Sequence, residues 1–240
     1  MLRYRLGVEL PLPPTCLSCG RSQDPFGDHT LSCSRVNFVA RHNTLCAGLG
    51  RLLLDSGFAV QREVPLPLPQ TQERPADLLV ANFAESRPLA LDISVVHPLQ
   101  PSSSIAGASP GRLADERALT KINHYRAACS VAQWDFSPIT FETTGAWSAS
   151  TATFVRRWSL LVGMSTGSPA AKCFATLSWA VSTLLAKAVG ENMARGLGNN
   201  FPQLPSISLP LPSPHPQSPQ PERHLGGPGA RHPRMDTTGH

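Results

Sequence analysis

The amino-acid sequence predicts an α/β protein in which helices flank a central sheet and a small metal-binding unit comes first. Three observations support this prediction. Short apolar runs of strand length alternate with longer segments of helical periodicity. Hydrophobic residues make up 41% of the 240 residues, which suffices for a core. Three of the six cysteines lie close together in a polar, turn-rich segment, as expected of ligands to one metal ion.

The expected elements follow the order helix, three strands, helix, strand and two helices. The first helix covers 36–56, because apolar residues recur there at near-helical spacing and Gly57 follows the last turn. Those residues are Val36, Val39, Leu45, Leu49, Leu52 and Leu53. Strands are expected at 58–64, 76–83, 88–96 and 137–143, and further helices at 112–130, 150–163 and 170–195. This order favours a sheet with helices on both faces.

The chain is expected to consist of five parts. Residues 1–15 are extended and proline-rich and resemble the end of an upstream region. Residues 16–34 form the small metal-binding unit, 35–145 the main domain, and 146–198 the C-terminal helices. Residues 199–240 are expected to be a disordered tail, because they are dense in proline and poor in large apolar side chains.

The net charge and the apolar stretches of the sequence indicate which binding partners and which cellular location to expect. The formal net charge is +5, and a mild positive balance suits contact with nucleic-acid phosphates. Many proteins with other functions share such a balance, so the charge alone does not assign the partner. The first residues form no signal peptide, and no apolar stretch reaches the ~18–20 residues of a membrane span. We therefore expect no membrane partner and no secretion, with a nuclear location in a eukaryote and an intracellular one otherwise.

The cysteine-rich segment has the spacing C-x2-C-x9-H-x3-C. Its four candidate ligands are Cys16, Cys19, His29 and Cys33. Three thiolates and one imidazole form a closed tetrahedral set, which is typical of structural zinc. The alternative is a group of unrelated thiols, but a unit of this size has no adequate core without a metal ion. The scattered Cys46, Cys129 and Cys173 are expected to be core thiols.

Two aspartates interrupt the apolar runs of neighbouring strands. Asp77 begins the run ADLLV, and Asp92 lies inside LALDISV. A carboxylate among aliphatic residues needs a cation, a hydrogen-bond network or a metal ion. Carboxylate oxygens suit Mg²⁺, which can activate water against a phosphodiester. Glu63 is a candidate third carboxylate; in the alternative the aspartates are structural and pair with arginines such as Arg74.

Basic residues on the two nearest helices strengthen this site. Lys121 and Tyr125 lie four positions apart on the expected helix and therefore on one face, with Arg117 one turn earlier. A lysine there can orient water or neutralise charge in a transition state, and the alternative is a solvated basic face. Arg41 and His42 open the first helix, either as contacts to the DNA backbone or as a plain surface pair.

Together these motifs resemble a known family. The chain is similar to the C-terminal region of site-specific non-LTR retrotransposon reverse transcriptase proteins, where a zinc knuckle precedes a restriction-endonuclease-like domain of the PD-(D/E)xK superfamily. The resemblance spans roughly residues 8–145. It rests on CLSCGRSQDPFGDHTLSC at 16–33, ARHN at 40–43, RPAD at 74–77, LDISVV at 91–96 and KINHY at 121–125.

The resemblance implies a fold and a site. The fold is a restriction-endonuclease-like core, a mixed sheet flanked by helices, preceded by a small zinc knuckle. Asp77 and Asp92 match the carboxylates that bind catalytic Mg²⁺. Lys121 matches the catalytic lysine, which in this clade stands on the following helix, and Tyr125 matches its partner tyrosine.

The sequence departs from the general superfamily pattern at two places. Ala76 separates Pro75 from Asp77, which are adjacent in a standard member. Ser94 stands two positions after Asp92, where a standard member has its lysine. The second departure agrees with a lysine that has moved to the helix, and it leaves activity to be tested.

The family implies a metal-dependent endonuclease that nicks target DNA, so that the freed 3′ hydroxyl primes reverse transcription. No polymerase motif is present in the chain, so we expect a fragment of a polyprotein, whose missing upstream polymerase would bind the element RNA. The main alternative is a catalytically inactive nucleic-acid-binding remnant of the same fold. A different nuclease, such as a junction resolvase, and an interaction protein that acts through its proline-rich tail are further alternatives.

Overall fold

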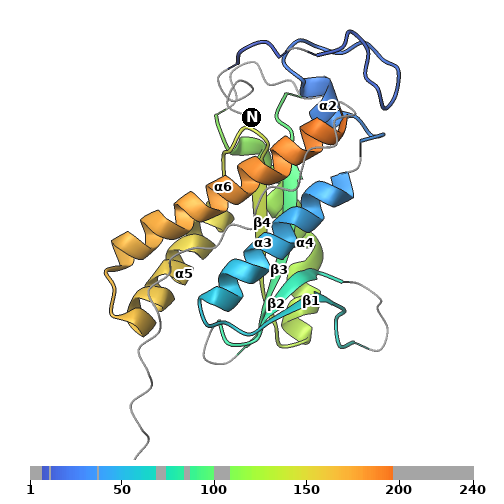
Figure 1. Ribbon diagram of the computed structural model, residues 1–240. Coiled ribbons are helices and arrows are strands. Elements are labelled where there is room, and N and C mark those ends of the chain that lie inside the picture. Colours follow the sequence, from blue (N-terminus) through green and yellow to red (C-terminus); the bar gives the residue numbers. More distant parts are fainter. Residues whose placement is uncertain are drawn as a thin grey trace, which may run out of the picture.

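The computed structural model describes residues 7–10, 12–36, 38–68, 74–83, 87–99 and 109–196 and has a mixed α/β fold. Figure 1 shows one sheet with helices packed against it. The expected tail at 199–240 lies outside the described residues, as does part of 1–15.

The observed order of elements confirms the order expected from the sequence. The elements are α2 (Asp28–Ser32), α3 (Phe38–Asp55), β1 (Val60–Val64), β2 (Ala76–Val80), β3 (Leu89–Val96), α4 (Arg112–Val131), β4 (Asp135–Glu142), α5 (Ala149–Thr166) and α6 (Ala170–Gly196). Their ends differ from the expected ends by a few residues, and α2 is a short helix inside the cysteine-rich segment.

The sheet is mixed and has the strand order β1-β2-β3-β4. β1 pairs antiparallel with β2, and β2 with β3, through short connections. β3 and β4 are parallel, because α4 carries the chain back across one face of the sheet. In this register Asp92 lies beside Pro138, near the middle of the two longest strands.

The strands alternate their side chains between two apolar clusters. Leu91 and Ile93 of β3 belong to the larger cluster, which is completed by α3, α5 and α6. Ala90 belongs to the smaller cluster, under α4. The prediction of helices on both faces is therefore confirmed. Among the apolar positions expected of the first helix, Val39 is 65% exposed, so it is not a core residue.

Helix α6 is long and packs against several elements. It contacts α3, α5 and α2. By length and composition it is the one helix, within the described ranges, that would suffice to cross a membrane, although no such stretch was expected. The core helices of soluble proteins can be equally long and apolar, and 44% of the apolar stretch of α6 is buried.

The cysteine-rich segment is held against the end of this core. Figure 1 shows α2 beside the C-terminal end of α6. Gly196 lies so close to Thr30 that a Cβ on the glycine would meet the threonine methyl group. The buried imidazole of His97, just after β3, places Nε2 3.4 Å from Asp28 Oδ1 and Nδ1 2.7 Å from Thr143 Oγ1. These contacts fix the orientation of the segment relative to the sheet.

Candidate functional site

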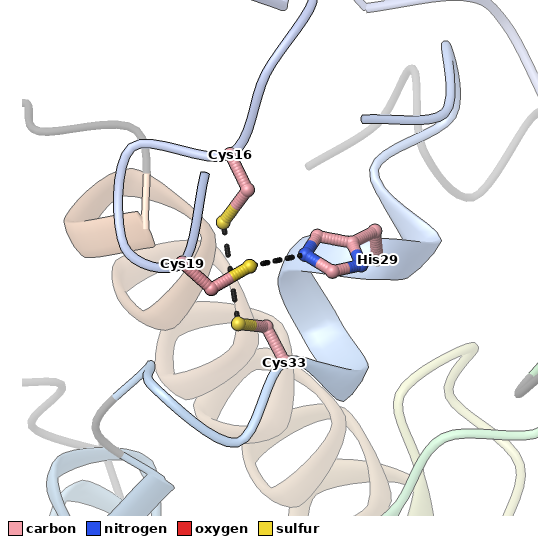
Figure 2. A group of neighbouring side chains, drawn as sticks. All are labelled: Cys16, Cys19, His29 and Cys33. Atoms are coloured by element: carbon pink, nitrogen blue, oxygen red, sulfur yellow. Dashed lines mark hydrogen bonds between the residues drawn. The ribbon is translucent and has the colours of Figure 1, made fainter. Parts of the chain in front are cut away.

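The side chains of Cys16, Cys19, His29 and Cys33 meet at one point, and we call them the Cys3His cluster (Figure 2). Their ligand atoms all lie within 4.8 Å of one another. Cys16 Sγ is 4.0 Å from Cys33 Sγ, and Cys19 Sγ is 3.1 Å from His29 Nε2. Tetrahedral zinc with ordinary bond lengths separates two sulfurs by about 3.8 Å and sulfur from nitrogen by about 3.6 Å. The cluster can therefore bind a metal ion such as zinc.

Local turns bring these four residues together. The N–H of Gly20 donates to the Cys16 carbonyl, and Gly20 has a left-handed φ of 73°, which favours glycine. Asp24 then caps α2, because its carboxylate accepts the N–H groups of Asp28 and His29 at 3.0 and 2.6 Å. Burial opposes ionisation of Asp24, but these N–H groups lower its pKa below the ordinary value. The cap directs His29 and the end of α2 towards the cysteines.

Hydrogen bonding makes one thiol of the cluster unusually acidic. The backbone N–H of Arg21 is the main cause that lowers the pKa of Cys19 to about 6, and His29 adds to this effect. Burial instead raises the pKa of Cys33. A thiolate is the form that binds metal, so the exposed edge of the cluster is prepared for a cation.

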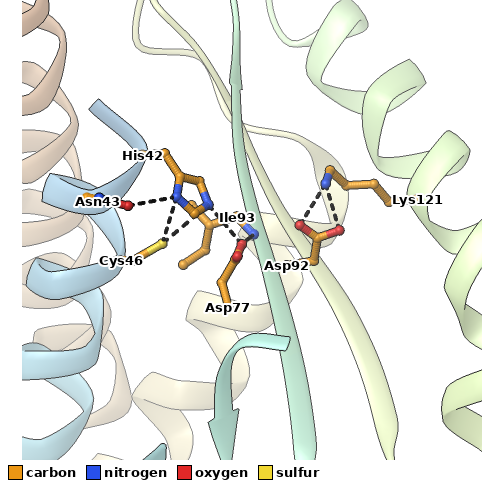
Figure 3. A network of polar contacts seen from close by, with 7 residues as sticks. All are labelled: His42, Asn43, Cys46, Asp77, Asp92, Ile93 and Lys121. Atoms are coloured by element: carbon orange, nitrogen blue, oxygen red, sulfur yellow. Dashed lines mark hydrogen bonds and ion pairs between the residues drawn. The ribbon is translucent and has the colours of Figure 1, made fainter. Parts of the chain in front are cut away.

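A second polar site lies where β2 and β3 separate. Their backbone pairing ends at Leu78 and Leu91. Beyond that point the Asp77 carboxylate replaces a backbone acceptor, and its Oδ2 accepts the Ile93 N–H at 2.6 Å. Asp77 therefore lies between the strands, where side chains from both faces of the sheet can reach it (Figure 3).

Asp92 lies beside Asp77 and is paired with Lys121. The Lys121 ammonium donates to both oxygens of Asp92 at 2.6 Å, and the two side chains are 13% and 10% exposed. Burial raises the pKa of Asp92, the lysine opposes this, and the nearby Asp77 carboxylate adds to the increase. The structure therefore brings Asp77, Asp92 and Lys121 close together.

On the other side of Asp77 stands His42 of α3. His42 Nε2 lies 3.1 Å from Asp77 Oδ2. The hydrogen bond with Asp77 is the main cause that raises the pKa of His42 to about 10, so the metal-free imidazole is protonated at neutral pH. Cys46, one turn later on α3, places its sulfur 3.4 Å from the same Nε2, and burial raises its pKa.

A pocket of about 310 Å³ opens between α3, β3 and α4 beside these residues. Its charged lining residues are Arg41, His42, Asp92, Arg117 and Lys121. Four of these five side chains are cations, and the fifth, Asp92, is the carboxylate that Lys121 binds. The positive balance of this lining attracts anions.

Arg41 and Ser94 line this pocket and differ in their hydrogen bonding. Arg41 is buried, donates to the Val95 carbonyl at 3.2 Å and lies over the Phe38 ring. The interpretation of Arg41 and His42 as a plain surface pair is therefore wrong. Ser94 Oγ is buried at the pocket wall and has no hydrogen-bond partner in the described part of the chain. An unsatisfied hydroxyl at a pocket wall is available to a ligand or a water molecule.

Two further predicted site residues lie at the edges of this arrangement. Tyr125 follows Lys121 by one turn of α4 and packs against Phe136, with ring centroids 5.7 Å apart. Glu63 is exposed on β1 at a left-handed φ of 51°. It joins neither of the close groups of potential metal ligands found among the described residues. Neither residue's catalytic role is tested by these contacts.

Cys46 was expected to be a core thiol and was not predicted as a functional residue. It is indeed buried, but its sulfur faces His42 and Asp77. The H-x3-C spacing at 42–46 was the available signal, because residues four apart share one face of a helix.

In comparisons with known proteins, no family model and no curated protein sequence matches this chain.

Proposed function

We propose that this chain is a Mg²⁺-dependent endodeoxyribonuclease domain with a restriction-endonuclease-like core and a zinc knuckle. It nicks target DNA for insertion of a retrotransposon and belongs to a reverse transcriptase polyprotein. The observation that carries the proposal is the meeting of Asp77, Asp92 and Lys121, from two neighbouring strands and a crossing helix, at the side of a cationic pocket. The retrotransposon assignment depends on the motif resemblance alone.

The donor set fits a hard cation. Asp77 and Asp92 supply carboxylate oxygens, and the buried Ser94 hydroxyl offers a further oxygen beside them. Bound Mg²⁺ would supply Lewis-acid activation of water and charge stabilisation at the phosphate. Ile93 holds Asp77 through its N–H, so this carboxylate is oriented before any ion arrives.

In this proposal Lys121, Arg117 and Arg41 interact with the phosphate of the DNA. Lys121 is held at the carboxylates by its ion pair with Asp92, and there it can orient the attacking water or stabilise developing negative charge. Arg117 is exposed at the pocket and is suited to bind the DNA backbone. Arg41 is buried and fixed by Val95, so it presents its charge from a rigid position.

The Cys3His cluster supports a structural zinc ion in this proposal. Four soft or borderline ligands leave no open position, as in closed structural sites rather than catalytic ones. Its attachment to the core through Asp28 and His97 would place a second DNA-contacting surface at a fixed position.

One observation favours the inactive alternative. Lys121 donates to both oxygens of Asp92, so the lysine by itself balances the charge of this carboxylate. A remnant that kept the fold and bound nucleic acid without cutting it would keep this ion pair as a structural contact. The following assay distinguishes the two functions.

Nicking of supercoiled plasmid by the purified chain, with and without Mg²⁺, tests the proposal. Asp77→Asn and Asp92→Asn remove charge from the metal site and should abolish nicking. Lys121→Ala should lower the rate ~10²–10³-fold, as expected when one electrostatic group leaves a catalytic site. Branched DNA, assayed in parallel, tests the junction-resolvase alternative.

Matched controls come from the same chain. Asp135→Asn changes a carboxylate at the first residue of β4, beside Leu89 and three positions before Pro138, and Lys172→Ala removes an exposed lysine on α6. Both should nick like the parent. Parent protein that binds DNA but never cuts it in Mg²⁺ or Mn²⁺ would establish the inactive alternative. Unchanged nicking by both aspartate variants would make these carboxylates structural.

A further inference from the structure

Outside the Cys3His cluster, His42, Cys46 and Asp77 form a second group of potential metal ligands. A nitrogen, a sulfur and a carboxylate oxygen from these residues all lie within 4.8 Å of one another. His42 and Cys46 share one face of α3, and Asp77 comes from β2 (Figure 3). None of the three acts as a partner in the ion pair between Asp92 and Lys121.

The distances within this group suit a tetrahedral zinc ion. His42 Nε2 lies 3.1 Å from Asp77 Oδ2, and Cys46 Sγ lies 3.4 Å from His42 Nε2. Ordinary zinc bond lengths at tetrahedral angles separate nitrogen from oxygen by about 3.4 Å and sulfur from nitrogen by about 3.6 Å. A small outward movement of the side chains would accommodate the ion.

The geometry also distinguishes a metal site from a thiol nucleophile. In a relay of thiol, imidazole and carboxylate, the sulfur and the carboxylate contact opposite nitrogens of the ring. Here Asp77 Oδ2 contacts Nε2, and Cys46 Sγ lies 3.4 Å from this same Nε2 and 3.6 Å from Nδ1, so the sulfur is not confined to the nitrogen opposite the carboxylate. Cys46 is also only 3% exposed, which keeps its sulfur from an external substrate.

We propose that His42, Cys46 and Asp77 bind one zinc-class divalent cation, through imidazole nitrogen, thiolate and carboxylate. The fourth ligand is water or an anion in the pocket, because His42 lines that pocket. One thiolate and one carboxylate balance the two positive charges of the ion, so the loaded group is neutral. This mixed donor set favours zinc over Mg²⁺, which prefers oxygen ligands.

Two residues outside the group hold its ligands in position, as is usual for metal ligands. Asn43 Oδ1 lies 3.4 Å from His42 Nδ1, where it can accept the proton of the ring nitrogen that does not bind metal. The Ile93 N–H holds Asp77 from the sheet side. Both partners fix ligand orientation without occupying the point of convergence.

Metal content of the full chain tests this inference and does not depend on nuclease activity. After zinc loading and removal of free metal, the parent should retain two zinc ions, one in each group, with the three-ligand site releasing its ion first to a chelator. Cys46→Ala and His42→Ala should each retain one. Replacement with Co²⁺ should give a thiolate charge-transfer band that loses the Cys46 contribution in both variants.

The matched control is Cys173→Ala, which removes an equally buried thiol that belongs to no group of potential ligands within the described ranges. It should retain both ions. His42 has a 37% exposed side chain, so its replacement leaves the core intact even if loss of the buried Cys46 sulfur disturbs folding. A parent that retains a single ion, or variants that retain two, would overturn the inference. Absence of nicking would leave it unaffected.

Discussion

The carboxylate of Asp77 faces two groups of different chemistry. On one side are His42 and Cys46, and on the other is Asp92 with its lysine. The position is possible because the side chain replaces a backbone acceptor at the point where β2 leaves β3. An acceptor that already receives one backbone N–H is held in place, so any cation on either side meets a preset ligand.

Arg117 gives the residue-scale prediction. It is exposed at the pocket, so its side chain contributes little to the packing of the core. Arg117→Ala should weaken DNA binding, reduce the slope of log affinity against log salt by about 1 and leave the melting temperature unchanged. Fluorescence anisotropy over a salt series measures the affinity and its salt dependence, and thermal denaturation measures the melting temperature.

Arg126→Ala is the matched control, because Arg126 is exposed on the same helix but does not line the pocket. It should bind DNA more tightly than the Arg117 variant does. Equal losses in the two variants would mean that the general charge of α4, rather than the pocket, contacts DNA.

At the scale of elements, the approach of α3 to α6 depends on a glycine. A Cβ on Gly48 would meet the Leu184 side chain at 2.3 Å, whereas a Cβ on Gly50 would meet Leu78 at an ordinary 3.4 Å. The helix that carries His42 and Cys46 is therefore positioned by close packing on its other face.

The two glycines provide a prediction with an internal control. Gly48→Ala should lower the free energy of unfolding by about 1–3 kcal/mol, because the added methyl group overpacks the interface. Gly50→Ala should be neutral or stabilising by up to about 1 kcal/mol, because alanine is the better helix former. Urea denaturation measures both changes. A stable Gly48 variant would show that Leu184 moves aside without cost.

At the scale of the whole molecule, the Cys3His cluster has a small apolar core of its own beside the main core. Cys16, Cys33 and Val36 form their own small apolar cluster. The cysteine-rich segment meets the main core through Leu31, which belongs to that core, through His97 and through the end of α6. If the Cys3His cluster binds zinc, as proposed, a core of this size would depend on the ion, while the sheet and its helices would not.

Metal removal tests this division. A chelator should abolish hydrogen-exchange protection within 12–36 and weaken it at the last turn of α6. Amides of β3 and β4 should stay protected, because their core contains none of the cluster's ligands. Added zinc should restore protection. Loss of protection throughout the sheet would mean that the two cores unfold as one unit.

The order of the elements and the grouping of the four Cys3His residues could be predicted from the amino-acid sequence. Each helix and strand carries its own periodicity, and a C-x2-C turn with a nearby His and Cys closes through local contacts. Asp77 and Asp92 were also predictable as a pair, because a short connection between two apolar runs makes the strands antiparallel neighbours.

The way in which α3 meets the sheet could not be predicted, because it depends on tertiary packing. The contact between His42 and Asp77 joins residues 35 positions apart, and no local pattern specifies which helix face lies over the split between β2 and β3. The burial of Arg41, the exposure of Glu63 and the turn of Cys46 towards His42 follow from that packing. Periodicity specifies which face of an element is apolar, whereas the polar groups that meet across a core depend on how the faces dock.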